Sequence, residues 1–332
     1  MVASVANKEK KFRGLRPMEP SRDLRQVAAL IEEAFAGQLD FRGQEALREL
    51  KAMSRLGPLL WLLDRLSPEF HETFSGFVWV EEGRVVGNVT VNRSSWRSRK
   101  WFISNVAVER GYQARGIARG LMQAAIGMAR ERSGESVTLQ VRADNMPALK
   151  LYRDLGFEEL MGTTELQLKR VGRVTFVPAE GFTLRQRNYS EWHKEYELAQ
   201  AATPASEQRA KPIREEEFRK GVAERVVDWL GDIFSGQRSH RLAVDEGDRF
   251  IATLTVRASW WGGRHGLEMM VHPDYRGQVE EMLVTKALAL LGNYPGQGVA
   301  VKMSASHQEA IETLKRYGFV KGKTLLQMRL NL

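Results

Sequence analysis

The sequence contains no cysteine among its 332 residues, and this absence excludes several chemistries at once. Without a thiol the chain forms no disulfide, no thiolate metal site and no cysteine nucleophile. Its six histidines show neither an i,i+4 pair nor an HExxH motif, so the usual histidine pattern of a zinc site is missing too. We therefore predict a protein that holds no metal.

Long apolar runs are also missing. No stretch of the sequence approaches the roughly 18 consecutive apolar residues that a membrane-spanning helix requires. The first dozen residues carry Lys8, Lys10 and Lys11 and lack the apolar centre of a signal peptide. We expect a cytoplasmic protein with no membrane partner.

What is present fits a globular protein of two domains. A chain of 332 residues is longer than a typical single domain, and its 43% hydrophobic and 27% charged residues are ordinary proportions. The net charge of +9 favours anionic ligands such as nucleotides, phosphates or an acidic partner. A solubilising surface charge explains the same number equally well.

The two halves of the chain repeat one another. Val85–Val91 reads VVGNVTV and Phe250–Val256 reads FIATLTV, at an offset of 165 residues. Leu155–Phe157 and Tyr317–Phe319 both end in Gly-Phe, at an offset of 162 residues. A repeat of this length is a duplicated domain. The order of strand and helix patterns predicts an α/β (α+β) class with helices on a central sheet, and domains at residues 1–172 and 173–332.

A loop in the first half has the features of an anion site. Val106–Leu121 reads VAVERGYQARGIARGL, in which a strand, a tight turn and a helix start follow one another. Gln113, Gly116 and Ala118 give the spacing Q-x-x-G-x-A, and small residues let a phosphate approach the unpaired N–H groups of the helix start. The loop matches neither a Walker A motif nor a dinucleotide fingerprint. A glycine at a helix start is also a common turn device.

A second motif follows the next predicted strand. Asn145–Phe157 reads NMPALKLYRDLGF, which contains every fixed position of N-x-x-A-x-x-L-Y-x-x-x-G-F. Those positions are Asn145, Ala148, Leu151, Tyr152, Gly156 and Phe157. Together with the Q-x-x-G-x-A loop, this order of elements from about Phe12 to Arg170 resembles the GNAT acetyltransferase superfamily. The resemblance implies a mixed, mostly antiparallel central sheet flanked by helices in each half.

The resemblance also implies a site for acetyl-CoA, or another acyl-CoA, in a V-shaped gap between two splayed strands. Asn145 would contact the co-substrate, although a helix-capping role for the same residue is compatible with this one. The strand residues beside the pantetheine and the acetyl carbonyl would be Val106, Ala107 and Val108. The loop residues around the pyrophosphate would be Gln113, Ala114, Arg115, Gly116, Ile117, Ala118 and Arg119.

The implied catalytic acid is Tyr152. A phenol with a pKa near 10 can donate a proton to a departing thiolate, although a packed helix aromatic is the alternative role. No general base stands out among the carboxylates near the implied site, and a water chain is an alternative. These carboxylates are Glu32, Glu33, Glu81, Glu82, Glu109 and Glu165.

The second half has lost the same features. Its loop begins Tyr275–Gly277 but is one residue shorter, so that Gly116 aligns with Gln278 or Val279, and Ala118 with Glu280 or Glu281. Carboxylates here would repel a pyrophosphate and could occupy its place. His307 replaces Asn145 and Leu314 replaces Tyr152. We predict a degenerate copy that binds no CoA in the usual way, in a tandem arrangement similar to that of mycothiol synthase and its relatives.

A basic hairpin leaves a different function open. Its cations are Arg93, Arg97, Arg99 and Lys100, and its aromatic residues are Trp96 and Trp101. Such a hairpin can bind nucleic acid, although an exposed hairpin covering the edge of the core, or a docking patch for an acidic acceptor, is consistent with the same residues.

The sequence therefore predicts an N-acetyltransferase that moves an acetyl group from acetyl-CoA to a primary amine by direct attack. The acceptor is unspecified, and the chain is expected to be a monomer with an internal pseudo-dimer or a homodimer. The alternatives are a non-catalytic acyl-CoA-binding or scaffolding module and, less favoured, a nucleic-acid-binding protein.

Overall fold

The computed structural model describes residues 12–37, 41–55, 75–93, 98–210, 212–219, 221, 236–260, 263–295 and 298–332. These residues form two compact units. Unit 1 contains the described residues up to Gln140, together with Pro147–Glu158 and Met328–Leu332. Unit 2 contains Val141–Met146 and the described residues of Glu159–Gln327.

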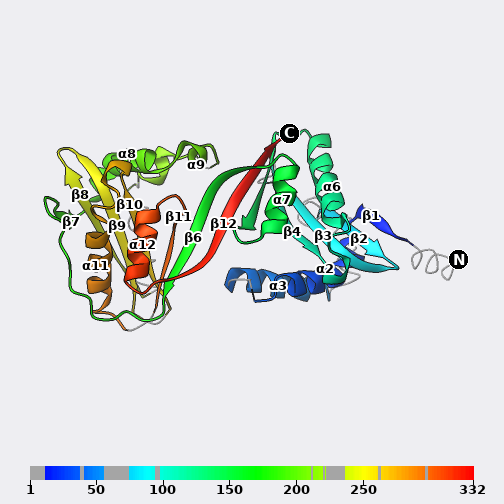
Figure 1. Ribbon diagram of the computed structural model, residues 1–332, viewed down its shortest axis with the longest axis horizontal. Coiled ribbons are helices and arrows are strands. Elements are labelled where there is room, and N and C mark those ends of the chain that lie inside the picture. The colour runs from blue at the N-terminus through cyan, green and yellow to red at the C-terminus, as the bar shows by residue number, and fades with distance from the viewer. Residues whose placement is uncertain are drawn as a thin grey trace. The chain divides into compact units, whose positions relative to one another are not determined.

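The sheet of unit 1 has the strand order β1-β2-β3-β4-β5, and Figure 1 labels β1 to β4. The first four strands run antiparallel to their neighbours, and β5 runs parallel to β4. The turn between β2 and β3 has positive φ at both central residues, Glu82 and Gly83, as a tight hairpin requires. The strands are β1 (Gly14–Pro17), β2 (Gly76–Glu81), β3 (Arg84–Arg93), β4 (Lys100–Val108) and β5 (Ser136–Arg142).

Helices cover both faces of this sheet. They are α2 (Pro20–Ala34), α3 (Phe41–Met53), α6 (Ile117–Glu131) and α7 (Met146–Asp154). On one face, Val27 and Ile31 of α2 share a core cluster with Val78 of β2 and Ala107 of β4. On the other face, a Cβ atom at Gly87 would lie 2.9 Å from Ile117 Cγ2, so the glycine lets α6 approach β3 closely.

The sheet of unit 2 has the strand order β12-β6-β11-β10-β9-β8-β7. Strands β10 and β11 are parallel. The pairs β10–β9, β9–β8, β8–β7 and β11–β6 are antiparallel. The predicted mixed and mostly antiparallel sheet is therefore confirmed. The strands are β6 (Glu158–Leu168), β7 (Leu184–Gln186), β8 (Gln237–Glu246), β9 (Arg249–Ser259), β10 (His265–Val271), β11 (Val299–Ser304) and β12 (Val320–Asn331).

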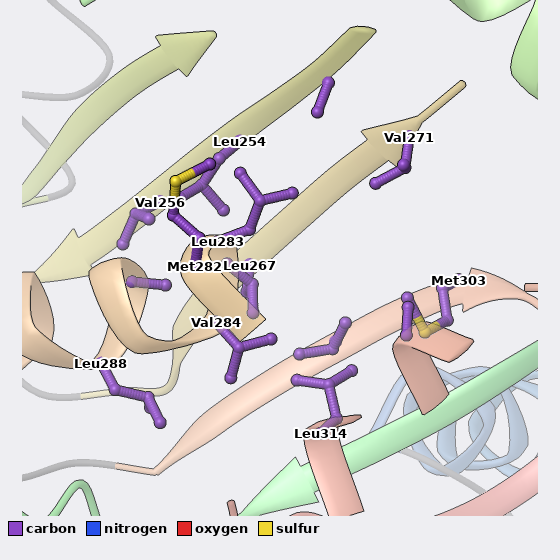
Figure 2. Packing of buried hydrophobic residues seen from close by; sticks show 14 of the residues in the cluster. Leu254, Val256, Leu267, Val271, Met282, Leu283, Val284, Leu288, Met303 and Leu314 are labelled. Carbon is purple, nitrogen blue, oxygen red and sulfur yellow. The ribbon is translucent and has the colours of Figure 1, made fainter. Parts of the chain in front are cut away.

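Alternating residues direct the helices of unit 2 to opposite faces of its sheet. Ala243 and Phe250 pack on Leu198 of α8, whereas their neighbours Val244 and Ile251 belong to the cluster formed with α11 and α12. Figure 2 shows this larger cluster, with residues of α11 packed over β9 and β10. The helices are α8 (Trp192–Ala202), α9 (Ala205–Ala210), α11 (Glu280–Leu291) and α12 (Gln308–Arg316).

The compact units do not follow the repeat in the sequence. Strand β6 belongs to the first repeat, yet it pairs with β11 from Leu168↔Val299 to Thr163↔Ser304, and its Leu166 is fully buried in the core of unit 2. The last five residues of the chain belong to unit 1, where the Leu332 N–H donates to the Glu135 carbonyl at 3.1 Å. A division after residue 172 thus describes the repeat, while the strand that ends each repeat extends into the other unit.

Candidate functional site

Strand β4 carries a β-bulge at its centre. Between the pairs Asn88↔Ala107 and Thr90↔Ser104, β3 advances by two residues and β4 by three. The extra residue on β4 is accommodated at Asn105, which has a φ of 51°, a left-handed conformation that is uncommon for a residue other than glycine. The bulge bends β4 immediately before the predicted co-substrate residues.

Pairing between β4 and β5 is confined to the first half of each strand. The described register runs from Lys100↔Ser136 to Ile103↔Leu139, although β4 continues to Val108 and β5 to Arg142. This is the splay that the resemblance implied.

The peptide groups of Val106 and Val108 face this opening. The Glu109 N–H donates to the Val86 carbonyl of β3 at 2.9 Å, and backbone groups alternate in direction along an antiparallel strand. The backbone N–H and carbonyl groups of Ala107 and Glu109 therefore point toward β3. Those of Val106 and Val108 point toward the β5 side. The Val108 carbonyl indeed accepts a hydrogen bond from Gln113 Nε2 at 3.0 Å.

The loop that follows β4 ends in an open helix start. Ala114 and Gly116 both have positive φ, 59° and 80°, and Gly116 is the N-cap of α6. No side chain caps this helix, and its first backbone hydrogen bond runs from the Gly120 N–H to the Gly116 carbonyl. The preceding N–H groups have no partner within the helix, and they carry the positive end of the helix dipole. The geometry fits an anion such as a pyrophosphate.

Two arginines flank this open start, and both are held by neighbouring groups. Arg115 donates to the Gly111 carbonyl at 2.8 Å and lies over the Tyr112 ring, 5.0 Å from its centroid. Arg119 forms an ion pair with Asp154 at the end of α7, at 2.9 Å. Both guanidinium groups are exposed, so they add positive charge beside the loop.

Tyr152 lies on α7 with only 6% of its surface exposed. Its ring packs near Phe157, with the ring centroids 6.0 Å apart. Burial raises the pKa of Tyr152 to about 12, because the phenolate would lose its hydration. The phenol therefore remains protonated at neutral pH and is available as a hydrogen-bond donor.

Asn145 lies immediately before α7 and is exposed. Its backbone N–H donates to the Arg142 carbonyl at the end of β5, at 3.0 Å. This bond fixes the residue where β5 ends and α7 begins, a position from which its side chain can reach either the helix start or a ligand.

None of the carboxylates considered as a general base has a distinctive environment. Glu32 is paired with Lys51 at 2.6 Å, Glu109 with Arg84 at 2.8 Å, and Glu165 with Lys302 at 3.1 Å. The other three are Glu81, which accepts from Trp79 Nε1, Glu82, which pairs with Arg13, and the exposed Glu33. Each carboxylate with a partner is thus engaged in a surface or strand-end contact.

The equivalent helix start in unit 2 is filled by the chain itself. Glu280, at the start of α11, has only 1% of its surface exposed. One of its carboxylate oxygens accepts from the Gly277 N–H at 2.7 Å, and the other bonds to His307 Nε2 at 2.8 Å. His307 is the N-cap of α12 and occupies the position that Asn145 has in the first repeat. The predicted carboxylate therefore occupies the loop.

The pattern of buried residues in α6 and α11 determines how the two helix starts align in sequence. The buried residues of α6 recur in α11 at an offset of 162 residues, as with Leu121 and Leu283, whereas Tyr112 and Tyr275 close the preceding turns at an offset of 163. The missing residue lies between them, and Ala118 corresponds to Glu280. Leu314, labelled in Figure 2, replaces Tyr152 with a fully buried aliphatic side chain.

The basic hairpin is only partly described, because Trp96 and Arg97 lie outside the described residues. Trp101 is 1% exposed and has the Arg93 guanidinium 5.0 Å from its ring centroid. Arg99 donates to the Ser133 carbonyl at 2.9 Å. Trp101 is thus a core residue and offers no face on which a base could stack.

Membrane-spanning helices and clusters of metal-binding side chains are both absent from the described part of the chain. No helix within it is long and apolar enough to cross a membrane. Within the same residues, no three or more histidine, aspartate or glutamate side chains gather in a way that could hold a metal ion.

The sequence motifs did not point to Asn88 and Asn105, which meet at the bulge of β4. Asn88 Nδ2 donates to the Asn105 carbonyl at 3.0 Å. The one signal in the sequence was a polar residue in the middle of the apolar strand VVGNVTV, at a position where the second repeat has Thr253. The bulge itself depends on the pairing register, which the sequence does not display.

Comparisons with known proteins agree with this geometry. A model of the acetyltransferase (GNAT) family matches residues 44–157. Streptothricin acetyltransferase of Streptomyces lavendulae is 37% identical over 76 residues, which are 23% of this chain and 40% of that protein. The N-alpha-acetyltransferase RimI of Mycobacterium tuberculosis is 29% identical over 136 residues, which are 40% of this chain and 84% of that protein.

A likeness to a solved structure extends over both units. The crystal structure of a GCN5-related N-acetyltransferase from Sphaerobacter thermophilus covers 96% of this chain and 95% of its own, with a TM-score of 0.55 and 16% identity. That likeness concerns the fold, whereas the family match covers the loop and α7 described above. The chain thus carries a GNAT acetyltransferase domain within residues 44–157.

Proposed function

We propose that the protein transfers an acetyl group from acetyl-CoA to a primary amine, using its first repeat. The observation that carries this proposal is the open, uncapped start of α6 beside the splayed end of β4. GNAT acetyltransferases use acetyl-CoA as co-substrate, and both named relatives are acetyltransferases.

The N–H groups of the loop would hold the pyrophosphate of acetyl-CoA. The positive φ values of Ala114 and Gly116 let successive N–H groups turn toward one ligand, and a Cβ atom added at Gly116 would meet nothing within 4 Å. The space above the loop is therefore open to an anion. The residues assigned to the pyrophosphate are Gln113, Ala114, Arg115, Gly116, Ile117, Ala118 and Arg119.

The peptide groups of Val106, Ala107 and Val108 would align the pantetheine arm and the acetyl carbonyl. The Val106 N–H faces the opening between β4 and β5, where it can donate to the thioester carbonyl oxygen. A backbone donor in a fixed position stabilises the negative charge that develops on that oxygen during attack by an amine. Asn145, at the end of β5, would contact the co-substrate from the other strand.

The reaction needs one bond to form and one to break. The amine nitrogen bonds to the carbonyl carbon, the carbon–sulfur bond breaks, and the amine proton passes to water. Tyr152 would donate its proton, or a hydrogen bond, to the departing sulfur. Because burial raises the pKa of Tyr152 to about 12, its hydroxyl is protonated at neutral pH, and after any proton transfer to the sulfur the phenolate would regain a proton from water.

Unit 2 would bind no acetyl-CoA, because the Glu280 carboxylate already accepts from the Gly277 N–H. We assign co-substrate binding and catalysis to the first repeat, residues 1–172, and a supporting role to the degenerate second repeat, residues 173–332. The names of the relatives refer to streptothricin and to N-alpha acetylation, and we leave the acceptor at the level of a primary amine.

The proposal is tested by following CoA release from acetyl-CoA with a thiol reagent, in the presence of pooled primary amines. The pools contain amino acids, aminoglycosides and peptides with free N-termini, and tertiary amines serve as the negative pool. Release that depends on a primary amine, with an acetylated product identified by mass spectrometry, is the expected result. Tight binding of acetyl-CoA without transfer to any pool would instead favour a non-catalytic acyl-CoA-binding module.

A further inference from the structure

Asn88 on β3 is a polar residue in an apolar environment. Its side chain is fully buried. In the register of the sheet it lies opposite Val78 on β2 and Ala107 on β4, and both of these belong to the apolar cluster beneath α2. An apolar residue of similar size would fill this position without desolvating a polar group.

The hydrogen bonds of Asn88 are incomplete. Nδ2 donates to the Asn105 carbonyl at 3.0 Å, whereas Oδ1 is buried with no hydrogen-bond partner among the described residues. A buried acceptor without a partner costs folding free energy. The presence of asparagine is therefore explained by the one hydrogen bond that it does make, which is directed to the bulge of β4.

That hydrogen bond fixes a peptide plane in the proposed site. The Asn105 carbonyl and the Val106 N–H belong to the same planar, trans peptide group, and they point in opposite directions. Because Asn88 holds the carbonyl toward β3, the Val106 N–H is held toward the opening between β4 and β5. Asn105 has a φ of 51°, so this peptide orientation is one that the backbone would not adopt readily without support.

The corresponding strands of unit 2 have neither the bulge nor the asparagine. Strands β9 and β10 pair without interruption from Arg257↔Gly266 to Ala252↔Val271. Thr253 occupies the position of Asn88, opposite Met270, and no residue of β10 has a positive φ. The bulge and the asparagine are thus present together in the copy with the open loop and absent together in the copy whose loop is filled.

We propose that Asn88 is a positioning residue for acetyl transfer, which orients the Val106 N–H toward the thioester carbonyl by holding the Asn105 carbonyl. The proposal rests on the acetyltransferase function assigned to unit 1. Asn88 itself contacts neither substrate, so its effect is on the rate of the chemical step and not on the binding of acetyl-CoA.

The test replaces the asparagine with an apolar residue of similar size, Asn88→Leu. We expect kcat to fall about tenfold, a smaller loss than removal of a direct oxyanion donor causes, while the Kd for acetyl-CoA stays near the wild-type value. The Tm should change little, because removal of the unpartnered Oδ1 offsets the loss of the hydrogen bond to the Asn105 carbonyl. The matched control is Val78→Ala in the same cluster, which should lower the Tm and leave kcat near wild type.

The outcomes separate this proposal from the function on which it rests. A wild-type enzyme that transfers acetyl groups and an Asn88→Leu variant with unchanged kcat would overturn the positioning role alone. A wild-type protein without any transfer would overturn the function instead. If the leucine variant does not fold, Asn88→Ala is measured below its own Tm, where the same fall in kcat is expected and an unchanged kcat refutes the proposal.

Discussion

The two copies of the repeat differ most where a helix begins. In unit 1, α6 begins after two residues with positive φ and has no capping side chain. In unit 2, the Glu280 carboxylate is buried at the start of α11 and bonds both to a loop N–H and to His307. A helix start is stabilised by negative charge in either case. The second copy supplies that charge from its own chain, and in our proposal the first copy leaves it to the pyrophosphate of acetyl-CoA.

Under our proposal, the second copy has lost a binding function while its loop N–H keeps a hydrogen-bond acceptor. Replacing an open loop with an internal carboxylate satisfies the same backbone donors that an anionic ligand would satisfy. Two further changes accompany the carboxylate. His307 forms a hydrogen bond with it, and Leu314 fills the core at the position where unit 1 has Tyr152. The sheet and its helices are kept.

The largest expected effect comes from placing a carboxylate in the open loop, as unit 2 has done. Gly116→Asp adds negative charge where the pyrophosphate would bind and strains a residue with a φ of 80°. We expect the Kd for acetyl-CoA to rise on the order of 1,000-fold, since charge-assisted hydrogen bonds are lost and repulsion is added. Calorimetry measures this change. Gly111→Ala is the control, because its new Cβ would meet nothing within 4 Å, and an equal loss there would contradict the account.

Removing the hydroxyl of Tyr152 should have the next largest effect. Tyr152→Phe keeps the packing of the ring, so the Kd for acetyl-CoA should be little changed, while kcat falls on the order of 100-fold through the loss of the acid. Phe157→Leu perturbs the same packing and keeps the hydroxyl, so it should retain most of the activity. Steady-state kinetics on all three proteins checks this, and wild-type kcat in Tyr152→Phe would leave Tyr152 as a packing residue.

Removing the Glu280 carboxylate from the loop of unit 2 should lower the stability of the protein. Glu280→Ala leaves the Gly277 N–H and His307 without their partner, and we expect the free energy of unfolding to fall by about 2 kcal/mol. Glu280→Gln keeps an acceptor and should lose less. Denaturant unfolding gives both values. Inorganic phosphate should raise the Tm of the alanine variant more than that of the wild type, and equal shifts would show that the emptied loop takes no anion.

The smallest effect concerns alkaline pH. The folded-state pKa of Tyr152, about 12, lies above the unfolded value near 10, so its contribution to stability is complete below pH 10 and is lost as the pH rises toward 12. This single group should lower the free energy of unfolding by about 1.4 kcal/mol between pH 9 and pH 11. Comparison with Tyr152→Phe, which lacks the group, isolates the effect. Parallel pH profiles for the two proteins would contradict the buried position of the hydroxyl.

The sequence predicted the parts of the site that depend on local order. Gln113, Gly116 and Tyr152 follow strands in a fixed spacing, and their elements are the expected ones. The replacement of Ala118 by a carboxylate in the second copy was also visible, because the repeat supplies an internal alignment. The hydrogen bond of that carboxylate to His307 was not, since the two residues are 27 positions apart and meet only when α11 and α12 pack.

Long-range pairing accounts for what the sequence could not predict. The bulge at Asn105 exists only in the register between β3 and β4, and the role of Asn88 follows from that register. The pairing of β6 with β11 joins residues more than 130 positions apart, and no local pattern near Leu168 indicates it. Hydrophobic alternation predicts that such a strand exists, but it does not predict which strand pairs with it.

The number of acetyl-CoA molecules bound by the full chain tests the central claim most directly. Isothermal titration calorimetry of the wild-type protein should give one site per chain, and Gly116→Asp should abolish it. Two equal sites per chain, or one site that survives Gly116→Asp, would contradict the assignment of an open loop to unit 1 and a filled loop to unit 2.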